Sequence, residues 1–284
     1  MKKIILFGAS GNLGQQVAKE LVKNNYDLTL VVRSRSKAAS LSVLSGKYII
    51  ADVCKKDSLK GICDNQDIVV SAVGKSVSPT DNGKETFRQV DLEGNSNILE
   101  QAKISGVKKF VYFSAFCSED YPHLEYFRAH HEFSLLLIRS GIDYSIIKPP
   151  ALYSAFKELI LLARKGRLVT IGNGDKRTNP IFEGDLAKIS VSAIEEKNKI
   201  IEAGGNCIYT RRQLQEIIQR IVNDKKRIKT VPVWSIKSAL PIIRLFDRNM
   251  FDKFSFFLAV MSQDTIAPMV GKSSFPDYIK EHSK

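Results

Sequence analysis

The sequence has few residues that could cross-link the chain or bind a metal ion. Its four cysteines are scattered without C-x-x-C spacing, and none of its four histidines lies at metal-ligand spacing from a cysteine pair. We therefore expect neither a disulfide framework nor a metal site, and reduced thiols fit a cytoplasmic protein. No stretch approaches the roughly 18 apolar residues that span a bilayer. The chain also enters an apolar run at once, so we expect no signal peptide and no transmembrane segment.

Acidic residues are scarce relative to basic ones. The 284 residues include 43 Lys and Arg against 30 Asp and Glu, which gives a formal net charge of +13. The densest basic patch covers residues 225–229 and follows a predicted helix. Such a patch can attract nucleic acid or anionic lipid, but no nucleic-acid-binding motif accompanies it. We favour a solvated loop and expect no nucleic-acid partner.

Short apolar strands alternate with helical patterns through the first 150 residues. Strands are predicted at 3–7, 27–32, 48–51, 68–72, 110–114 and 144–148, and helices at 13–23, 58–63, 86–105 and 126–139. The strands are apolar on both faces, which is typical of strands buried in a parallel sheet. The alternation predicts an α/β fold with a doubly wound, mostly parallel sheet.

The rhythm of the chain changes after Pro149 and Pro150. We expect residues 1–150 to form the main domain, with residues 179–203 packing back onto it. Residues 151–178 and 204–284 then form a smaller C-terminal substrate lobe. The apolar stretch 251–261 is interpreted as the wall of a pocket or as core, in preference to a helix that touches a membrane.

A glycine loop at residues 8–14 is the most informative motif in the chain. Three glycines follow the pattern G-x-x-G-x-x-G between the first strand and the first helix. This arrangement places bare backbone N–H groups at a helix N-terminus, where the helix dipole adds about half a positive charge. A pyrophosphate fits such a loop. We predict a dinucleotide bound by the loop residues Gly8, Ser10, Gly11, Asn12, Leu13 and Gly14.

The residues after the second and fourth strands refine this prediction. Arg33 and Arg35 stand where an NAD-preferring protein carries a carboxylate. Two guanidinium groups suit a 2′-phosphate, so we predict NADP, with Arg33 as the stronger candidate. NAD, with both arginines simply in solvent, is the alternative. The small residues Ala72, Val73 and Gly74 would let the cofactor's ribose approach the backbone closely.

Ten short motifs between residue 4 and about residue 212 carry a family resemblance. In chain order they are the glycine loop, Val32-Arg33, Ala51-Asp52-Val53, Ala72-Val73-Gly74, the runs at 90–95 and 106–114, the run at 140–144, Lys148-Pro149-Pro150, Asp185-Leu186-Ala187 and Gly204-Gly205. With them the chain resembles the extended, atypical short-chain dehydrogenase/reductases of the NmrA-like, NAD(P)-binding branch. The resemblance implies a Rossmann fold and an NAD(P) cofactor, but no particular substrate.

The resemblance also implies further cofactor contacts. Asp52 would bond the adenine amino group, and Val53 would flank the adenine ring. An N-cap role for Asp52 in the next helix is the alternative. Pro149 and Leu152 would pack near the nicotinamide.

A catalytic set is implied as well, with one departure. In the family a serine binds the substrate carbonyl, and a tyrosine lies four residues before a lysine, so that the two stack on one helical face. The lysine lowers the tyrosine pKa, and the phenol passes a proton while the cofactor passes hydride. Here the positions are Ser114, Tyr126 and His130. A neutral imidazole supplies little fixed charge. Two interpretations therefore stay open. Either Tyr126 is catalytic, or Tyr126 is structural and His130 only contacts the cofactor. Ser134 replaces a glutamate common in this branch.

Three functions fit these features. We favour an NADPH-dependent oxidoreductase that reduces a small carbonyl, a quinone or a similar electrophile, because the cofactor half-site is complete. The missing lysine favours a non-catalytic NADP(H)-binding redox sensor or regulator. The basic charge and the apolar C-terminal stretch suit an assembly or scaffold subunit with a protein partner. The substrate is not specified by any motif.

Overall fold

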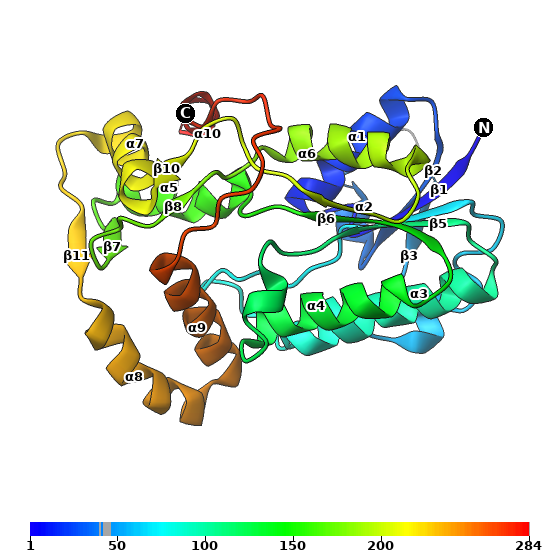
Figure 1. Ribbon diagram of the computed structural model, residues 1–284, viewed down its shortest axis with the longest axis horizontal. Coiled ribbons are helices and arrows are strands. Elements are labelled where there is room, and N and C mark those ends of the chain that lie inside the picture. The colour runs from blue at the N-terminus through cyan, green and yellow to red at the C-terminus, as the bar shows by residue number, and fades with distance from the viewer. Residues whose placement is uncertain (40, 42–46, 284) are drawn as a thin grey trace. The chain divides into compact units, whose positions relative to one another are not determined.

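A sheet of seven strands, in the order β3-β2-β1-β4-β5-β6-β9, organises the first of two units in the chain (Figure 1). The computed structural model describes residues 1–39, 41 and 47–283. The first unit comprises Met1–Lys75, Glu85–Lys148 and Glu183–Ile201. The second comprises Ser76–Lys84, Pro149–Phe182 and Glu202–Lys284.

The strands from β3 to β6 pair in parallel. They are β1 (Lys3–Phe7), β2 (Asp27–Val32), β3 (Lys47–Ile50), β4 (Ile68–Ser71), β5 (Lys109–Phe113) and β6 (Asp143–Lys148), with β9 (Lys199–Glu202) beyond β6. From β1 the chain adds strands first on one side, as β2 and β3, and then on the other side, as β4, β5 and β6. The gap between β1 and β4 is therefore the switch point of the strand order, where ligands bind in such sheets. The predicted α/β fold with a doubly wound parallel sheet is confirmed.

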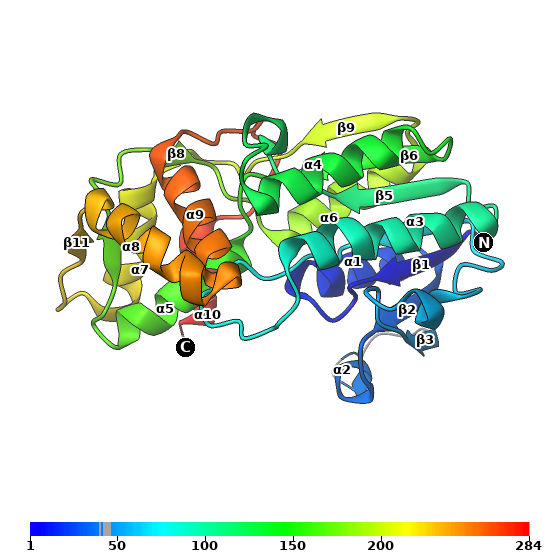
Figure 2. The same ribbon diagram turned by 90° about the horizontal axis from the view of Figure 1, so that it is seen from below.

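Helices cover both faces of this sheet. Figures 1 and 2 show α1 (Asn12–Lys23) and α6 (Glu183–Ser192) on one face, with α3 (Asn95–Ile104) and α4 (Glu125–Ile138) on the other. Strands β1, β4 and β5 are buried along nearly their whole length because their side chains meet helices on both sides. The apolar runs of the sequence therefore predicted these central strands correctly, whereas β3, at the edge of the sheet, is exposed along its length.

Shorter helical pieces differ from expectation. The helix expected at 58–63 is one 3₁₀ turn, Lys56–Leu59, followed by Gly61 with φ +68°. The helix expected at 86–105 consists of a π-helical segment, Arg88–Gly94, that continues into α3. The five-residue helix α2 (Arg35–Ala39) was not predicted, because so short a helix carries no apolar period. Further 3₁₀ turns lie at Ser118–Asp120, Ala193–Glu195 and, in the second unit, Tyr153–Phe156.

The second unit is mainly helical. Its helices are α5 (Lys157–Arg164), α7 (Arg211–Asn223), α8 (Val233–Phe246), α9 (Arg248–Ser262) and α10 (Phe275–His282), and its short strands are β7 (Val169–Ile171), β8 (Arg177–Thr178), β10 (Tyr209–Thr210) and β11 (Lys229–Val231). Its core gathers buried side chains from α5, α7 and α10 around Tyr153 and Phe275. A capping box formed by Thr210 and Gln213 begins α7. None of the helices in the described ranges has the length and apolarity of a membrane span.

The apolar stretch 251–261 lies within α9. Leu258 is buried there, and the other apolar side chains of the stretch are half-buried. In the same unit α9 packs along α8, and the ring of Phe251 receives the guanidinium groups of Arg244 and Arg248 at 5.4 Å. The stretch is therefore mostly covered, as a core or wall segment would be.

Candidate functional site

The glycine loop follows β1 at the switch point of the sheet, and its geometry requires glycine at two positions. Gly8 has φ +77°, and a Cβ atom there would lie 2.5 Å from the Ala72 carbonyl oxygen. A Cβ atom on Gly14 would lie 2.1 Å from the Gly8 carbonyl oxygen. No side chain fits at either distance, so the two glycines let β1, β4 and α1 approach one another closely.

The outer side of the loop is open toward a ligand. Gly11 is the N-cap of α1 and provides no side-chain cap, and the first turn of α1 carries no acidic residue. Gly11 and Asn12 are exposed, whereas Ser10 and Leu13 are half-buried, and the Ser10 carbonyl accepts a hydrogen bond from Gln15 Nε2. A Cβ atom on Gly11 would meet only the Gly8 carbonyl, at 3.4 Å. This cradle fits a pyrophosphate, which needs backbone N–H donors and no competing carboxylate.

The carboxyl end of β2 lies beside this loop because β2 pairs in parallel with β1, and the carboxyl end of β3 follows on the far side of β2. Arg33 directly follows β2 and is exposed. Arg35 begins α2, is exposed, and lines a surface hollow with Tyr48 and Ile50. Both guanidinium groups are accessible to an anion, as the predicted 2′-phosphate contact requires.

Asp52 and Val53 have different surroundings after β3. The Asp52 carboxylate accepts a hydrogen bond from the Cys54 backbone N–H at 3.1 Å, while the next helical turn has Lys55 at its N-cap position. Asp52 is therefore not the N-cap of that turn. Val53 is buried, and its carbonyl accepts a hydrogen bond from Asn97 Nδ2 at 2.9 Å.

The end of β4 completes the set of strand ends. Ala72 donates its N–H to the Phe7 carbonyl at 3.0 Å, and Ala72 and Val73 are half-buried while Gly74 is exposed. The structure thus brings the predicted cofactor residues of the first unit to one edge of the sheet. Pro149 and Leu152 belong to the second unit, and their contact with the nicotinamide stays a prediction.

A buried polar cluster surrounds His130 on α4. The Tyr112 hydroxyl is hydrogen-bonded to His130 Nδ1 at 2.6 Å, and Asp91 Oδ1 lies 3.5 Å from His130 Nε2. The ring of Tyr126, one helical turn earlier, meets the imidazole edge to face with ring centres 4.7 Å apart. We call His130, Tyr112, Asp91 and Tyr126 the His130 cluster. The imidazole is fixed on three sides.

Burial controls protonation in the His130 cluster. His130 is 5% exposed, and loss of solvent lowers its pKa to about 4. Burial likewise raises the pKa of Asp91 well above its ordinary value, against a smaller opposing effect from the Lys75 backbone N–H. The pKa of Tyr126 is raised by burial and, secondarily, by Asp91. At neutral pH the cluster therefore contains a neutral imidazole and a protonated phenol.

Ser114 lies at the end of β5 and is connected to α4 through Ser134. The two hydroxyl oxygens are 3.2 Å apart, and the Ser134 hydroxyl donates to the His130 carbonyl at 2.7 Å. A hydrogen bond with Ser114 also acts on the pKa of Tyr112, where it opposes the larger effect of burial. Ser114 and His130 thus belong to one buried network, as their predicted shared site requires.

Sequence reasoning missed the partners that hold His130. Asp91 stood in a motif of the family resemblance, but no role was assigned to it. Its only sequence signal is a carboxylate in an otherwise helical, half-apolar segment. Tyr112 was indistinguishable from the other apolar residues of β5.

Two further residues of the family motifs form ion pairs. Lys148, at the end of β6, pairs with Glu119 at 2.9 Å, and Asp185 pairs with Lys188 at 3.6 Å.

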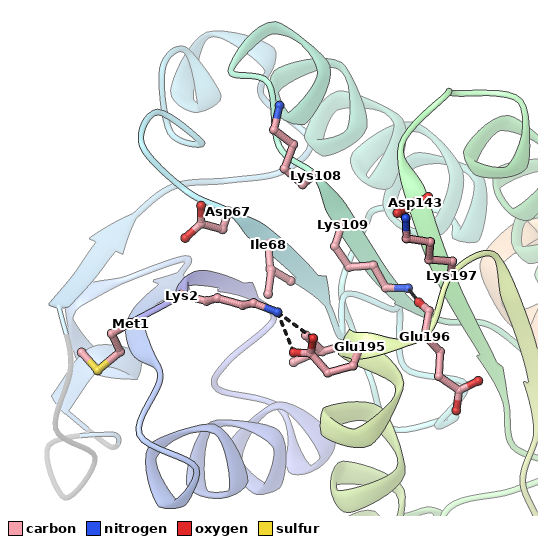
Figure 3. A pocket seen from close by; sticks show the side chains of 11 residues that line it. Met1, Lys2, Asp67, Ile68, Lys108, Lys109, Asp143, Glu195, Glu196 and Lys197 are labelled. Carbon is pink, nitrogen blue, oxygen red and sulfur yellow. Dashed lines mark hydrogen bonds and ion pairs between the residues drawn. The ribbon is translucent and has the colours of Figure 1, made fainter.

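A separate cavity of about 420 Å³ lies at the amino ends of β1, β4 and β5 (Figure 3). Lys2 and Glu195 form an ion pair at 2.7 Å beside it, and Lys109 donates to the Glu196 carbonyl. Lys2 and Glu195 thus satisfy each other, and Lys109 is held by a backbone carbonyl. Because the glycine loop follows the carboxyl end of β1, this cavity is at the opposite edge of the sheet from the dinucleotide residues.

Comparisons with known proteins agree with this geometry. A family model described as NAD(P)H-binding matches residues 8–197. The chain is 24% identical over 260 residues to the photosystem II assembly factor Ycf39 of Synechocystis sp., covering 89% of this chain and 78% of that protein. It is 27% identical over 250 residues to the chloroplastic divinyl chlorophyllide a 8-vinyl-reductase of Arabidopsis thaliana, covering 81% of this chain but 60% of that protein.

Solved structures share the fold. A UDP-glucose 4-epimerase of Thermotoga maritima matches with a TM-score of 0.75 at 16% identity, over 99% of this chain and 97% of that one. An NADPH-dependent quinone oxidoreductase of Escherichia coli, complexed with NADPH, matches with a TM-score of 0.72 at 18% identity, over 98% of this chain and 99% of that one. The chain therefore belongs to the NAD(P)H-binding family, as a member of the extended, NmrA-like short-chain dehydrogenase/reductase type.

Proposed function

We propose that this protein is an NADPH-dependent reductase whose acceptor is a quinone or a similar conjugated electrophile. The observation that carries the proposal is the neutral, buried His130 one turn after Tyr126. In this position a cation would lower the pKa of the phenol and make it an acid–base catalyst. Without that cation, Tyr126 remains protonated and its pKa lies above the ordinary value.

A protonated Tyr126 supports reduction in preference to oxidation. Oxidation of an alcohol needs a base that removes the hydroxyl proton, and a phenol with a raised pKa is seldom in the basic form. Reduction needs no base. The site is therefore suited to the reduced cofactor, NADPH.

The same phenol limits the class of acceptor. A ketone that receives hydride becomes an alkoxide and needs a proton in the transition state, which a weak acid supplies slowly. A quinone that receives hydride becomes a delocalised hydroquinone anion and takes its proton from water afterwards. Hydride from NADPH brings two electrons and one proton to the quinone, and water supplies the second proton. NADPH becomes NADP⁺.

Residues of the first unit would hold the cofactor. Gly8, Gly11 and Gly14 would accommodate the pyrophosphate, and Arg33 would bind the 2′-phosphate in a charge-assisted contact. The bound cofactor would supply the hydride. His130, whose ring nitrogens face Tyr112 and Asp91, would add no charge to the site.

Two similar proteins lend support through the activities in their names. The Arabidopsis protein is named a vinyl reductase, and the Escherichia coli fold neighbour is named an NADPH-dependent quinone oxidoreductase. One name describes reduction of a vinyl group, and the other describes NADPH-dependent chemistry on a quinone. Neither name includes an alcohol oxidation.

Steady-state NADPH oxidation with a panel of quinones and simple ketones tests the proposal. We expect turnover with quinones and little with ketones. Tyr126→Phe should keep the quinone rate within about tenfold, whereas an enzyme driven by tyrosine acid catalysis would lose about 10²–10⁴-fold. Tyr144→Phe, at the amino end of β6, is the matched control.

A second candidate is an NADP(H)-binding protein without turnover that acts in assembly. The specific observation in its favour is the similarity to Ycf39, an assembly factor by name. NADPH that binds tightly but is oxidised with no acceptor of the panel would support this candidate and overturn the reductase.

A further inference from the structure

We propose that α8 docks on an anionic membrane surface, where it lies flat among the lipid headgroups. This goes beyond the proposed reductase, which needs no membrane. The helix belongs to the second unit and is followed by α9 (Figure 1).

The exposed face of α8 carries large apolar side chains. Trp234 is 71% exposed, Ile242 63%, Leu245 81% and Phe246 83%. Trp234, Ile242 and Leu245 recur at the helical spacing that places them along one face, with the small polar Ser238 between the first two. Scattered single apolar residues are ordinary on a surface, whereas a stripe of this kind on one helix indicates an interaction site.

A different face of α8 is already covered within the unit. Ile236, Leu240 and Ile243 are half-buried, and α8 packs along α9. The contact with α9 therefore explains one apolar side of the helix but not the exposed stripe. A helix that is apolar on more than one side normally buries more than one side.

The charge around α8 identifies the partner. From residue 225 to residue 246 the chain has six basic residues and no carboxylate, and all six are exposed: Lys225, Lys226, Arg227, Lys229, Lys237 and Arg244. The first four precede the helix, and the last two lie on it. Anionic headgroups attract such cations, while long Lys and Arg side chains reach the headgroup level from a buried helix axis.

The geometry fits a helix that lies in the interface. Trp234 and Leu245 are separated by about 16 Å along the axis at the usual rise of an α-helix, so the stripe runs parallel to the axis. The 14 residues of α8 extend about 21 Å, which is too short to cross a bilayer core of about 30 Å. An apolar stripe flanked by basic residues, with tryptophan among the apolar ones, is typical of an interfacial helix. A second copy of the chain is a poorer partner, because six cations would face six cations.

Trp234 provides a direct test because it is the single tryptophan of the chain. The full-length protein is mixed with vesicles of phosphatidylcholine alone or with phosphatidylglycerol added. We expect a blue shift of the Trp234 emission and co-sedimentation with the anionic vesicles, both weakened by salt. Absence of the shift and of sedimentation with anionic vesicles would overturn the proposal.

Variants separate the apolar and the ionic contributions. Lys237→Gln with Arg244→Gln should weaken anionic-vesicle binding about 25-fold, since each cation near the surface contributes about fivefold. Leu245→Ser with Phe246→Ser should abolish the emission shift. Leu161→Ser, on α5 and 53% exposed, is the matched control and should bind as the wild type does.

Two further outcomes would count against the proposal. Equal binding to neutral and anionic vesicles would contradict the ionic contribution. An emission shift that depends on protein concentration in the absence of lipid would assign the stripe to a second copy. NADPH oxidation by the same preparations distinguishes failure of the reductase proposal from failure of this one, since α8 carries none of the cofactor residues.

Discussion

The buried pair of Asp91 and His130 should give the protein an unusual dependence of stability on pH, which Asp91→Asn would reveal. The two side chains lie 3.5 Å apart and are both buried. Burial lowers the pKa of His130 to about 4 and raises that of Asp91 well above its ordinary value. The hydrogen bond between the Tyr112 hydroxyl and His130 Nδ1 also fits a neutral ring. The amide that Asp91→Asn introduces could still accept the Lys75 backbone N–H that the Asp91 carboxyl accepts.

In the wild type the two effects oppose each other. Between pH 4 and about 6.5 the unfolded imidazole binds a proton that folded His130 does not bind, so the His130 contribution makes stability rise with pH. The raised pKa of Asp91 acts in the opposite direction, because the folded carboxyl keeps its proton above its ordinary pKa and stability then falls as the pH rises. The wild-type profile should therefore be flatter on the acid side than the profile of a variant that lacks the Asp91 carboxyl.

In Asp91→Asn only the His130 contribution to the pH dependence of this pair remains. Because the folded-state pKa is depressed, stability is fully present above the unfolded pKa of about 6.5 and decreases as the pH falls toward about 4. The interval of about 2.5 pH units at about 1.4 kcal/mol each gives a loss of about 3 kcal/mol in the free energy of unfolding. Above pH 6.5 the variant should show no slope from this pair.

Urea unfolding, followed by circular dichroism at a series of pH values from 4.5 to about 8, measures both profiles. Asp91→Asn combined with His130→Gln should remove the acid-side loss, and His131→Gln in the Asp91→Asn background is the control that should keep it. Parallel wild-type and Asp91→Asn profiles would refute the assignment of opposing pKa shifts to His130 and Asp91.

The cofactor site makes two more predictions. Gly14→Ala should lower both stability and NADPH affinity, because the new Cβ would lie 2.1 Å from the Gly8 carbonyl oxygen. Gly11→Ala should keep the stability and weaken mainly NADPH binding, because the nearest atom to its Cβ would be 3.4 Å away. Thermal unfolding with and without cofactor checks both. Arg33→Ala should raise the Kd for NADPH by about 10–100-fold, the usual value of a charge-assisted hydrogen bond, and leave NADH binding unchanged in a fluorescence titration. Equal changes for both cofactors would place Arg33 away from the 2′-phosphate.

The fold and the cofactor edge could be predicted because their signals are local. Strands buried on both faces are continuous apolar runs, and the glycines at 8 and 14 are required by contacts that every such loop makes. Short helical pieces such as α2 have no periodic signal, so they were missed.

The His130 cluster and the exposed stripe of α8 could not be predicted, because both depend on tertiary neighbours. Nothing in the sequence pairs Asp91 with a histidine 39 positions later, and Tyr112 is one more apolar residue of a buried strand. Apolar periodicity predicts that α8 buries a face, but not that a second apolar face stays exposed. The stretch at 251–261 was singled out for its apolarity, yet it is the preceding helix that exposes apolar side chains.

The most direct measurement of the proposed function is anaerobic mixing of the NADPH-loaded protein with a quinone. We predict that one NADPH is consumed for each quinone reduced, that the reaction depends on the protein, and that Gly14→Ala slows it through weaker cofactor binding. NADPH that binds, as its fluorescence would report, but stays reduced with every quinone tested would contradict the reductase.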